Sequence, residues 1–277
     1  MITRHHPDGV LPLEVWDVRV RCFEDRSLYR VDAIDHAAAV ADVVVQLRDG
    51  TAIRKRGLHL PRLPIERVVV AGGGAVADVV AAIVARGVEA VASEAPLMVA
   101  HRGGLALGRD VLGFAGDVLV VDVGQTSVKW FMNNRSGRAS RPESVKMEVD
   151  ARADADPEGW RQRTLRFLTD TISSSTIETS KPAALVLALP CEIADDLAVA
   201  GCSYPWPDGD ATLIAELIDG CGLDDVPAIV LNDAELAAVS VRDSGFGAGT
   251  LVLTVGLGLG GALITSKKEE RPEGRSC

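Results

Sequence analysis

Short runs of aliphatic and β-branched residues alternate along the chain with longer, helix-like stretches. Five runs predict strands, at 68–70, 118–121, 184–189, 228–231 and 251–255. Each is short and apolar throughout, as in strands of a sheet that is covered on both faces. Four stretches predict helices, at 75–85, 160–171, 211–221 and 234–242. This alternation predicts an α/β fold.

Three segments fall outside this alternation. Residues 133–158 are polar and predict a surface hairpin and loop, and residues 266–277 are charged and predict a frayed tail. Residues 244–266 carry no charge before the lysines, which is a feature of membrane spans. Their six glycines between 247 and 264 predict strand, loop and strand instead.

Composition narrows the function. The chain has 277 residues, of which 47% are hydrophobic, so two lobes with their own cores can form. The net charge of −10 argues against a general nucleic-acid surface, and bound phosphates would need local donors. The scattered cysteines imply neither a disulfide framework nor a zinc site. The N-terminus lacks the apolar core of a signal peptide, so we expect a cytoplasmic enzyme with no membrane partner.

The segment LVVDVGQTSVKW at 119–130 is the most informative part of the chain. We expect Gly124 to take the positive φ of a tight turn. The turn amides, the Thr126 hydroxyl and the Lys129 ammonium can then face a phosphate. Asp122, at the end of the strand, can hold a hydrated magnesium ion. A buried strand followed by an ordinary Gly-Gln turn explains the same residues equally well.

Two further glycine loops follow apolar strands. One is GLGLGG at 256–261, and the other is GGGA at 72–75. A glycine loop alone is a weak signal, because a tight connection without any ligand has the same composition. Three such loops after buried strands, one of them with an acid and a lysine, together favour nucleotide binding.

These motifs resemble the superfamily of sugar kinases, heat-shock ATPases and actins, in which two phosphate loops, an adenosine loop and a hinge join two α/β lobes. Residues 122–129 resemble the first phosphate loop and residues 72–75 the adenosine loop. Residues 256–261 resemble the second phosphate loop of ROK sugar kinases and polyphosphate glucokinases. Residues 230–239 resemble the ROK Asn-Asp-Ala segment, in which the aspartate is the catalytic base. The resemblance implies a two-lobed, actin-like (ribonuclease H-like) fold with a cleft between the lobes.

The order of the motifs is that of a circular permutant, because the adenosine loop comes first. We therefore expect residues 1–116 to form the lobe of the adenosine loop and residues 117–265 the lobe of the phosphate loops and catalytic Asp. Residues 8–17 resemble the hairpin that follows the second phosphate loop in the family. Gly9 and Ile264 should then lie on adjacent strands. The cut would fall in an exposed hairpin, where permutation is tolerated. A coincidental Asp-Gly turn is the alternative.

The resemblance implies magnesium- and ATP-dependent phosphoryl transfer to a hydroxyl of a small sugar or cyclitol. Asp233 would be the base, and Asn232, Glu14 and Trp206 would contact the acceptor. Asp122 would organise Mg²⁺. The nucleotide would contact Gly72, Gly73, Gly74, Gly124, Gln125, Thr126, Lys129, Gly256, Gly258 and Gly260.

The acceptor pocket departs from the family pattern. Cys191 stands where glycine is usual, and Asp17 stands where histidine is expected. A sugar derivative, a cyclitol or a degenerate site all remain open. Trp206 has an alternative role as core filler, and Asp233 has one as a helix N-cap without chemistry.

Two other function classes remain open. The first is a nucleotide-switched, actin-like ATPase, because residues 95–103 resemble the end of such chains. The second is a sugar-sensing regulator, although no helix-turn-helix precedes the fold and the acidic charge disfavours DNA. The phosphoryl donor is either ATP or polyphosphate. We expect no nucleic-acid partner and name a homodimer as the oligomer to test.

Overall fold

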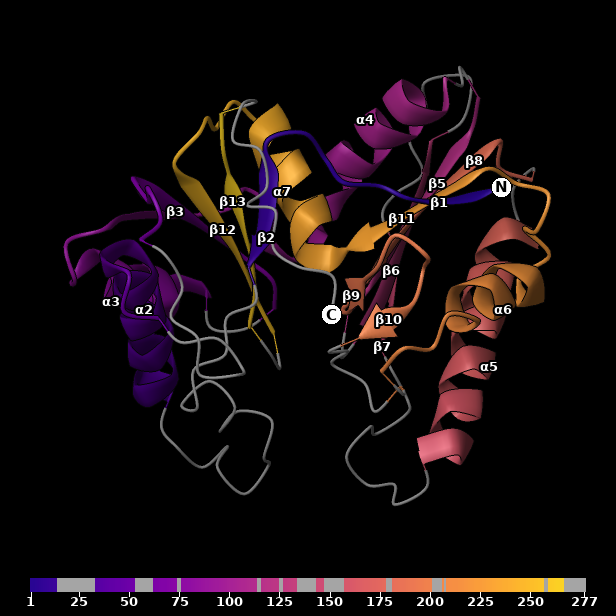
Figure 1. Ribbon diagram of the computed structural model, residues 1–277, viewed down its shortest axis with the longest axis horizontal. Coiled ribbons are helices and arrows are strands. Elements are labelled where there is room, and N and C mark those ends of the chain that lie inside the picture. Colours follow the sequence, from indigo (N-terminus) through magenta and orange to yellow (C-terminus); the bar gives the residue numbers. More distant parts are fainter. Residues whose placement is uncertain are drawn as a thin grey trace. The chain divides into compact units, whose positions relative to one another are not determined.

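The computed structural model consists of two compact α/β units (Figure 1). The first unit comprises Met1–His6 and Ala100–Leu236, and the second comprises Pro7–Val99 and Ala237–Cys277. The structure describes residues 1–13, 33–52, 62–73, 76–113, 116–124, 127–133, 143–146, 157–177, 181–200, 206, 208–256 and 259–266.

A six-stranded sheet forms the centre of the first unit. Its order is β1 (Ile2–Arg4), β11 (Ala228–Asn232), β8 (Ala184–Leu189), β5 (Val118–Val123), β6 (Ser127–Asn133) and β7 (Glu143–Lys146). The strands β1, β11, β8 and β5 are parallel, whereas β6 and β7 continue the sheet in antiparallel register. The short strands β9 (Glu192–Ile193) and β10 (Val199–Ala200) form a separate pair.

Helices cover both faces of this sheet (Figure 1). The helices α5 (Pro157–Ile177) and α6 (Leu213–Gly220) pack in one hydrophobic core with Leu119 and Val121 of β5. The neighbours of these residues, Val118 and Val120, point to the other face because side chains alternate along a strand. There they meet α4 (Ala100–Leu112).

The second unit is built on a five-stranded sheet. Its order is β2 (Val10–Leu13), β13 (Leu259–Ile264), β12 (Thr250–Val255), β3 (Arg67–Ala71) and β4 (Glu89–Ala92). The helices α2 (Ala33–Asp49) and α3 (Val76–Val84) share its hydrophobic core, and the 3₁₀ turn η2 (Pro96–Met98) follows β4. The helix α7 (Asp233–Asp243) begins in the first unit and ends in the second.

The two sheets share one plan. In each sheet, three strands lie next to one another in antiparallel pairs. Two further strands lie on the other side of the first of these three and run parallel to it. These are β5, β6, β7, β8 and β11 in the first unit, and β12, β13, β2, β3 and β4 in the second. This is the arrangement of a ribonuclease H-like sheet, and the predicted α/β fold class is confirmed.

In the second unit the third position of this plan is filled by β2, from the beginning of the chain. Val10 pairs with Ile264, and the Thr265 amide donates to the Gly9 carbonyl at 2.8 Å. The adjacency of Gly9 and Ile264 that we predicted is therefore present. Circular permutation remains a hypothesis that accounts for this order.

All five predicted strands and four predicted helices are present, within a few residues of their expected ends. The pattern did not predict α2 or α4. The predicted boundary at 116/117 differs from those of the compact units, because β12 and β13 pair with β3 and β2 and so join the adenosine loop's unit. The predicted tail lies outside the described residues apart from Ser266. None of the described helices combines the length and the apolarity that crossing a membrane requires.

Candidate active site

An ion pair lies at the end of the β5–β6 hairpin. Asp122 and Lys129 are directly opposite each other in the register, and the Lys129 Nζ lies 2.8 Å from the Asp122 Oδ2. Their side chains are only 11% and 15% exposed. Losing one partner of such a pair would leave a poorly solvated charge, which costs about 3–5 kcal/mol when burial is complete.

Gly124 closes this hairpin in a way that the sequence did not predict. Its φ is not positive, so the expectation of a left-handed turn at this residue was wrong. Its amide donates to the Ser127 carbonyl at 2.9 Å. A Cβ here would lie 3.2 Å from that carbonyl oxygen and 3.7 Å from the Lys129 Nζ, so glycine leaves space beside the ammonium. Gln125 and Thr126 lie outside the described residues.

The start of α7 shows which of two neighbours caps the helix. The Asn232 Oδ1 accepts from the Ala234 amide at 2.9 Å, and the Glu235 carboxylate accepts from the Asn232 amide at 3.0 Å. This reciprocal arrangement is a capping box, so Asn232 is the N-cap. Asp233 is the first residue of the helix, and its own Oδ1 also accepts from the Ala234 amide, at 2.8 Å. The cap alternative for Asp233 is therefore not needed.

The remaining contacts of Asn232 tie the helix start to β8. Its Nδ2 donates to the Cys191 carbonyl at 2.9 Å and lies 3.5 Å from the Leu189 carbonyl. Cys191 is disulfide-bonded, which the cysteine spacing did not indicate. The observed contacts of Asn232 are structural, and its contact with an acceptor hydroxyl stays a prediction.

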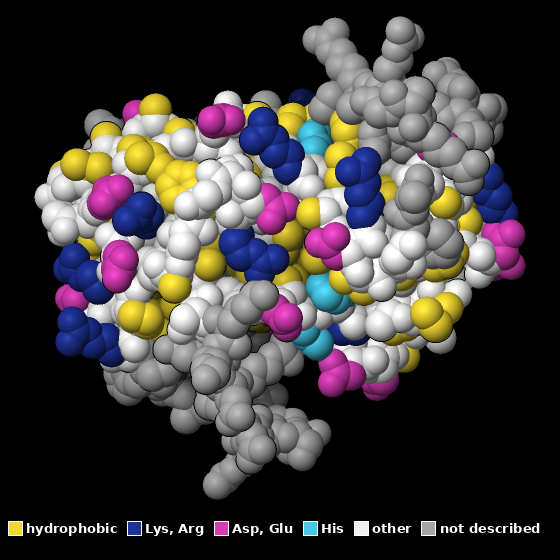
Figure 2. Space-filling view, turned by 90° about the horizontal axis from the view of Figure 1, so that it is seen from above, with side chains coloured by type: hydrophobic (Ala, Val, Ile, Leu, Met, Phe, Trp, Pro, Cys, Tyr) yellow, Lys and Arg dark blue, Asp and Glu magenta, His cyan; other side chains and the backbone are white. Residues whose placement is uncertain are grey.

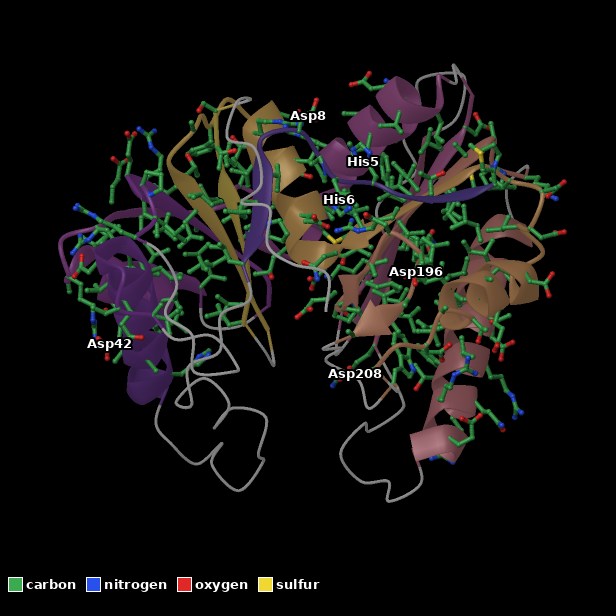
Figure 3. All side chains as sticks on the ribbon, in the orientation of Figure 1. His5, His6, Asp8, Asp42, Asp196 and Asp208 are labelled. Carbon is green, nitrogen blue, oxygen red and sulfur yellow. The ribbon has the colours of Figure 1, made fainter. Side chains whose placement is uncertain are left out.

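Glu235 is held by the N-terminal segment of the chain. The Arg4 Nη2 lies 2.6 Å from the Glu235 Oε2, and both side chains are almost completely buried. His6, labelled in Figure 3, places its Nε2 2.7 Å from the exposed Asp195 and its Nδ1 4.0 Å from the Glu235 Oε1. These contacts orient the first turn of α7, and with it Asp233.

Asp122 and Asp233 lie at the same edge of the sheet. Asp122 pairs with Ala188 of β8, and Asn232 pairs with the next residue, Leu189, from the other side. The backbones of β5 and β11 are thus separated by one strand, or roughly 10 Å. Burial raises the pKa of Asp233 from 3.8 to about 7, and the negative charge of Asp122 raises it further. The Ala234 amide and Lys129 oppose this rise. A carboxylate with a pKa near neutrality is suited to act as a general base.

His101 on α4 joins this group. It is 8% exposed and stacks on Phe131 of β6, with ring centroids 5.2 Å apart. Burial lowers its pKa from 6.5 to about 4, while the charge of Asp122 raises it and that of Lys129 lowers it. We did not predict a role for His101. Its i, i+3, i+7 spacing with Gly104 and Gly108 was a signal that could have indicated a helix face against a strand.

The glycine loops of the second unit start side by side. The strands β3 and β12 are parallel neighbours, so the loops after them begin at the same edge of the sheet. Gly72 has φ 102°, and a Cβ on it would lie 2.2 Å from the Val255 carbonyl oxygen, one residue before Gly256. Gly73 is exposed, and Gly260 lies in β13 opposite Thr254. Gly74 and Gly258 lie outside the described residues.

The predicted acceptor contacts are only partly described. Trp206 is 4% exposed and belongs to the same hydrophobic core as Cys191, which favours the core-filler alternative. Glu14 lies outside the described residues. The contacts of Glu14 and Trp206 with an acceptor stay predictions.

The magnesium prediction can be compared with the donors present. Within the described parts of the chain, no group of three or more His, Cys, Asp or Glu side chains is placed to hold a metal. The Asp122 carboxylate nevertheless fits Mg²⁺, which keeps several waters and takes one or two carboxylates. Its charge is strong enough at Asp233 to raise that pKa, so an added cation would be favourable here.

The expectation of no nucleic-acid partner stays a prediction, and Figure 2 shows the charged side chains of one face. On the face shown in Figure 2, the coloured Lys and Arg side chains are interspersed with Asp and Glu. Binding to a nucleic-acid backbone requires basic residues gathered into a patch or stripe.

Comparison with known proteins adds structural likenesses. No protein-family model matches the sequence, and no curated protein matches it. A polyphosphate/ATP-glucomannokinase from Arthrobacter sp. strain KM is similar, with 24% identity and a TM-score of 0.39, over 55% of this chain and 60% of that chain. A ROK family protein from Streptococcus pneumoniae TIGR4, in complex with sucrose, has 15% identity and a TM-score of 0.33, over 57% and 48%. A PPX-GPPA enzyme from Aquifex aeolicus has 13% identity and a TM-score of 0.36, over 75% and 82%. The chain thus spans less than two thirds of the length of the first two proteins.

Proposed function

We propose that this protein is a magnesium- and ATP-dependent kinase that phosphorylates a hydroxyl of a small sugar or cyclitol. One observation carries the proposal: Asp233, a carboxylate with a pKa of about 7, and the Asp122–Lys129 pair lie at the same end of two parallel strands that are separated by one strand. Phosphoryl transfer to a hydroxyl needs a proton acceptor next to groups that hold phosphate.

Asp233 would accept the proton of the acceptor hydroxyl as the oxygen–phosphorus bond forms. The Ala234 amide holds its Oδ1, which leaves Oδ2 for the proton. Near pH 7 a useful fraction of the carboxylate is ionised, and a base of raised pKa binds the transferred proton more tightly than an ordinary aspartate does. The capping box of Asn232 and Glu235 would keep this carboxylate in place.

Lys129 would contact the phosphates of the donor. The Gly124 amide already donates to the Ser127 carbonyl, so it would not donate to a phosphate as well. The contribution of Gly124 would instead be the space that its missing side chain leaves beside the Lys129 ammonium. Asp122 would hold the magnesium ion, which when bound supplies charge neutralisation to the phosphates. The close approach of Gly72 to β12 would suit the backbone contact with adenosine that we predicted.

A thermal-shift screen is the first test, because a ligand that binds the native state raises its stability. The donors to compare are Mg-ATP and polyphosphate. The acceptor panel should contain glucose, mannose, sucrose, their N-acetyl derivatives and cyclitols, since similar structures include a glucomannokinase and a sucrose complex. Consumption of ATP that depends on one acceptor would support the kinase.

Three other outcomes separate the alternatives. ATP hydrolysis without any acceptor, together with nucleotide-dependent polymerisation, would indicate an actin-like ATPase. Stabilisation by a sugar without turnover would indicate a sensor. The absence of any response to nucleotide or polyphosphate would refute the proposal.

A further inference from the structure

The role proposed for Lys129 raises a problem that its surroundings answer. If Lys129 turns to a bound phosphate, the Asp122 carboxylate loses the ammonium that lies 2.8 Å from it. Even with magnesium on the other oxygen, the Oδ2 that the ammonium leaves needs another hydrogen-bond donor at that moment, because an unpaired, poorly solvated acceptor is costly. His101 is a buried polar side chain whose charge state responds to both residues.

The packing of α4 determines where His101 lies. A Cβ on Gly108 would come within 2.5 Å of a Val118 methyl, and a Cβ on Gly104 within 2.4 Å of a Val120 methyl. The absence of these side chains lets α4 approach β5 closely. His101 is one turn before Gly104, and Asp122 is two residues after Val120, so the same helix face carries His101 to the level of the ion pair.

The stack on Phe131 confirms this level. Phe131 pairs with Val120 and Lys129 pairs with Asp122, so Phe131 and the ion pair lie two residues apart on one face of the hairpin. His101 stacks on Phe131 at a centroid distance of 5.2 Å with 24° between the planes. Its ring thus lies beside the ion pair.

His101 has a nitrogen available for this exchange. Its Nε2 is buried and has no hydrogen-bond partner among the described atoms. A buried polar atom without a partner destabilises the folded state by about 1–3 kcal/mol. Such an atom requires an explanation, and a partner that forms in another state of the molecule is one.

We propose that His101 is a positioning residue that donates a hydrogen bond from Nε2 to the Asp122 carboxylate when Lys129 turns to a phosphate. The inference rests on the proposed nucleotide binding at Lys129. The imidazole stays neutral throughout, with its proton on Nε2, and no charge is created next to the site. Lys129 would thus exchange partners while Asp122 keeps one.

The test removes Lys129 instead of adding a ligand. His101→Phe keeps the stack on Phe131 and removes the nitrogens, so in the otherwise unchanged protein the melting temperature should stay the same or rise. In a Lys129→Met background, His101 is expected to take over Asp122. The same His101→Phe change should then lower the melting temperature, by about 2–4 °C per kcal/mol lost in a chain of this size. His36→Phe, at a half-buried histidine of α2, is the control and should act alike in both backgrounds.

A second measurement does not depend on the folding of these variants. Imidazole ¹⁵N NMR of the unmodified protein, with His101→Gln for assignment, reports the hydrogen-bond state of Nε2. Addition of Mg-ATP should shift this resonance. His101→Phe should also weaken Mg-ATP binding by about 10–100-fold, as loss of a partner of a metal-site carboxylate does, and His101→Gln should restore most of it.

The outcomes distinguish the two proposals. A reversal of the sign of the His101→Phe effect between backgrounds supports the exchange. The same effect in both backgrounds, or an Nε2 resonance that ignores bound Mg-ATP, overturns it. A sign reversal in a protein that binds no nucleotide supports His101 as the second partner of Asp122 and refutes the kinase assignment.

Discussion

Replacing Asp233 by Asn separates chemistry from structure at the start of α7. The change keeps the shape of the side chain and leaves the capping box intact, because Asn232 and Glu235 form it. It removes the only property that general-base catalysis uses, a carboxylate that can bind a proton. Turnover should therefore fall by about two to four powers of ten.

The structure also predicts the effect on stability, with its sign. The pKa of Asp233 is raised from 3.8 to about 7 by burial and by Asp122, so the folded state binds its proton more tightly than the unfolded chain does. The stabilisation that the protonated form provides is complete below about pH 4 and is lost as the pH rises to 7. The shift of about 3 units corresponds to on the order of 4 kcal/mol. Asn does not ionise, so Asp233→Asn should be more stable than the natural protein at pH 8, and the difference should vanish near pH 4. Loss of a negative charge at the helix N-terminus offsets about 0.3–1 kcal/mol of this gain.

The assay pairs initial rates with urea unfolding from pH 4 to 8. The natural protein should lose stability with rising pH while its rate rises with an apparent pKa near 7, and Asp233→Asn should show neither dependence. A normal rate in Asp233→Asn with a verified acceptor would leave the kinase without its base. Equal stability of the two proteins across this range would show that folding does not raise the pKa of Asp233.

Three other substitutions test the remaining geometry. Asp122→Ala should abolish Mg-ATP binding, measured by calorimetry, and retained binding would rule out the role of Asp122 in holding magnesium. Because the change leaves Lys129 unpaired, it should also lower the free energy of unfolding by up to about 3–5 kcal/mol. Gly104→Ala should lower the free energy of unfolding by about 1–3 kcal/mol, because its Cβ would meet Val120 at 2.4 Å; Gly247→Ala, where a Cβ meets nothing within 4 Å, is the control, and equal effects would contradict the close packing of α4. Gly72→Ala should lower the free energy of unfolding, measured in urea, by more than Gly247→Ala does, and it should weaken nucleotide binding. The reason is that Gly72 has a φ of 102° and that a Cβ on it would lie 2.2 Å from the Val255 carbonyl oxygen. Unchanged stability and binding would contradict the packing of the adenosine loop.

The strands could be predicted from sequence because each of the buried ones is a continuous apolar run with a clear end. The helix α4 could not, because Gly103, Gly104 and Gly108 lower helix propensity by about 1 kcal/mol each relative to Ala. Tertiary packing overrides that propensity here, since Gly104 and Gly108 allow close contact with β5. The boundary between the units could not be predicted from the sequence either, because it depends on the pairing of β12 and β13 with strands from the other end of the chain.

The candidate site shows the same limit. The motif drew attention to Asp122 and Lys129, but it did not predict their ion pair, which depends on the register of a hairpin in which they are seven positions apart. Asn232 and Asp233 are equally good caps in sequence and both accept from the Ala234 amide, so the bond from the Asn232 amide to Glu235 distinguishes them. His101 acquires its surroundings from residues 21 to 30 positions later, so no local pattern indicates its role.

The energetics of Asp233 argue for chemistry over structure. If position 233 served only packing or capping, a neutral side chain would make the folded protein more stable, because the ionised carboxylate is destabilised by burial and by Asp122. Asn232 already satisfies the helix end, so the negative charge of Asp233 adds little as a cap. A carboxylate that destabilises the folded protein at neutral pH, and that lies beside a lysine able to face phosphate, has the properties a general base requires. If Asp233→Asn gains stability and loses turnover together, both properties belong to the same carboxylate.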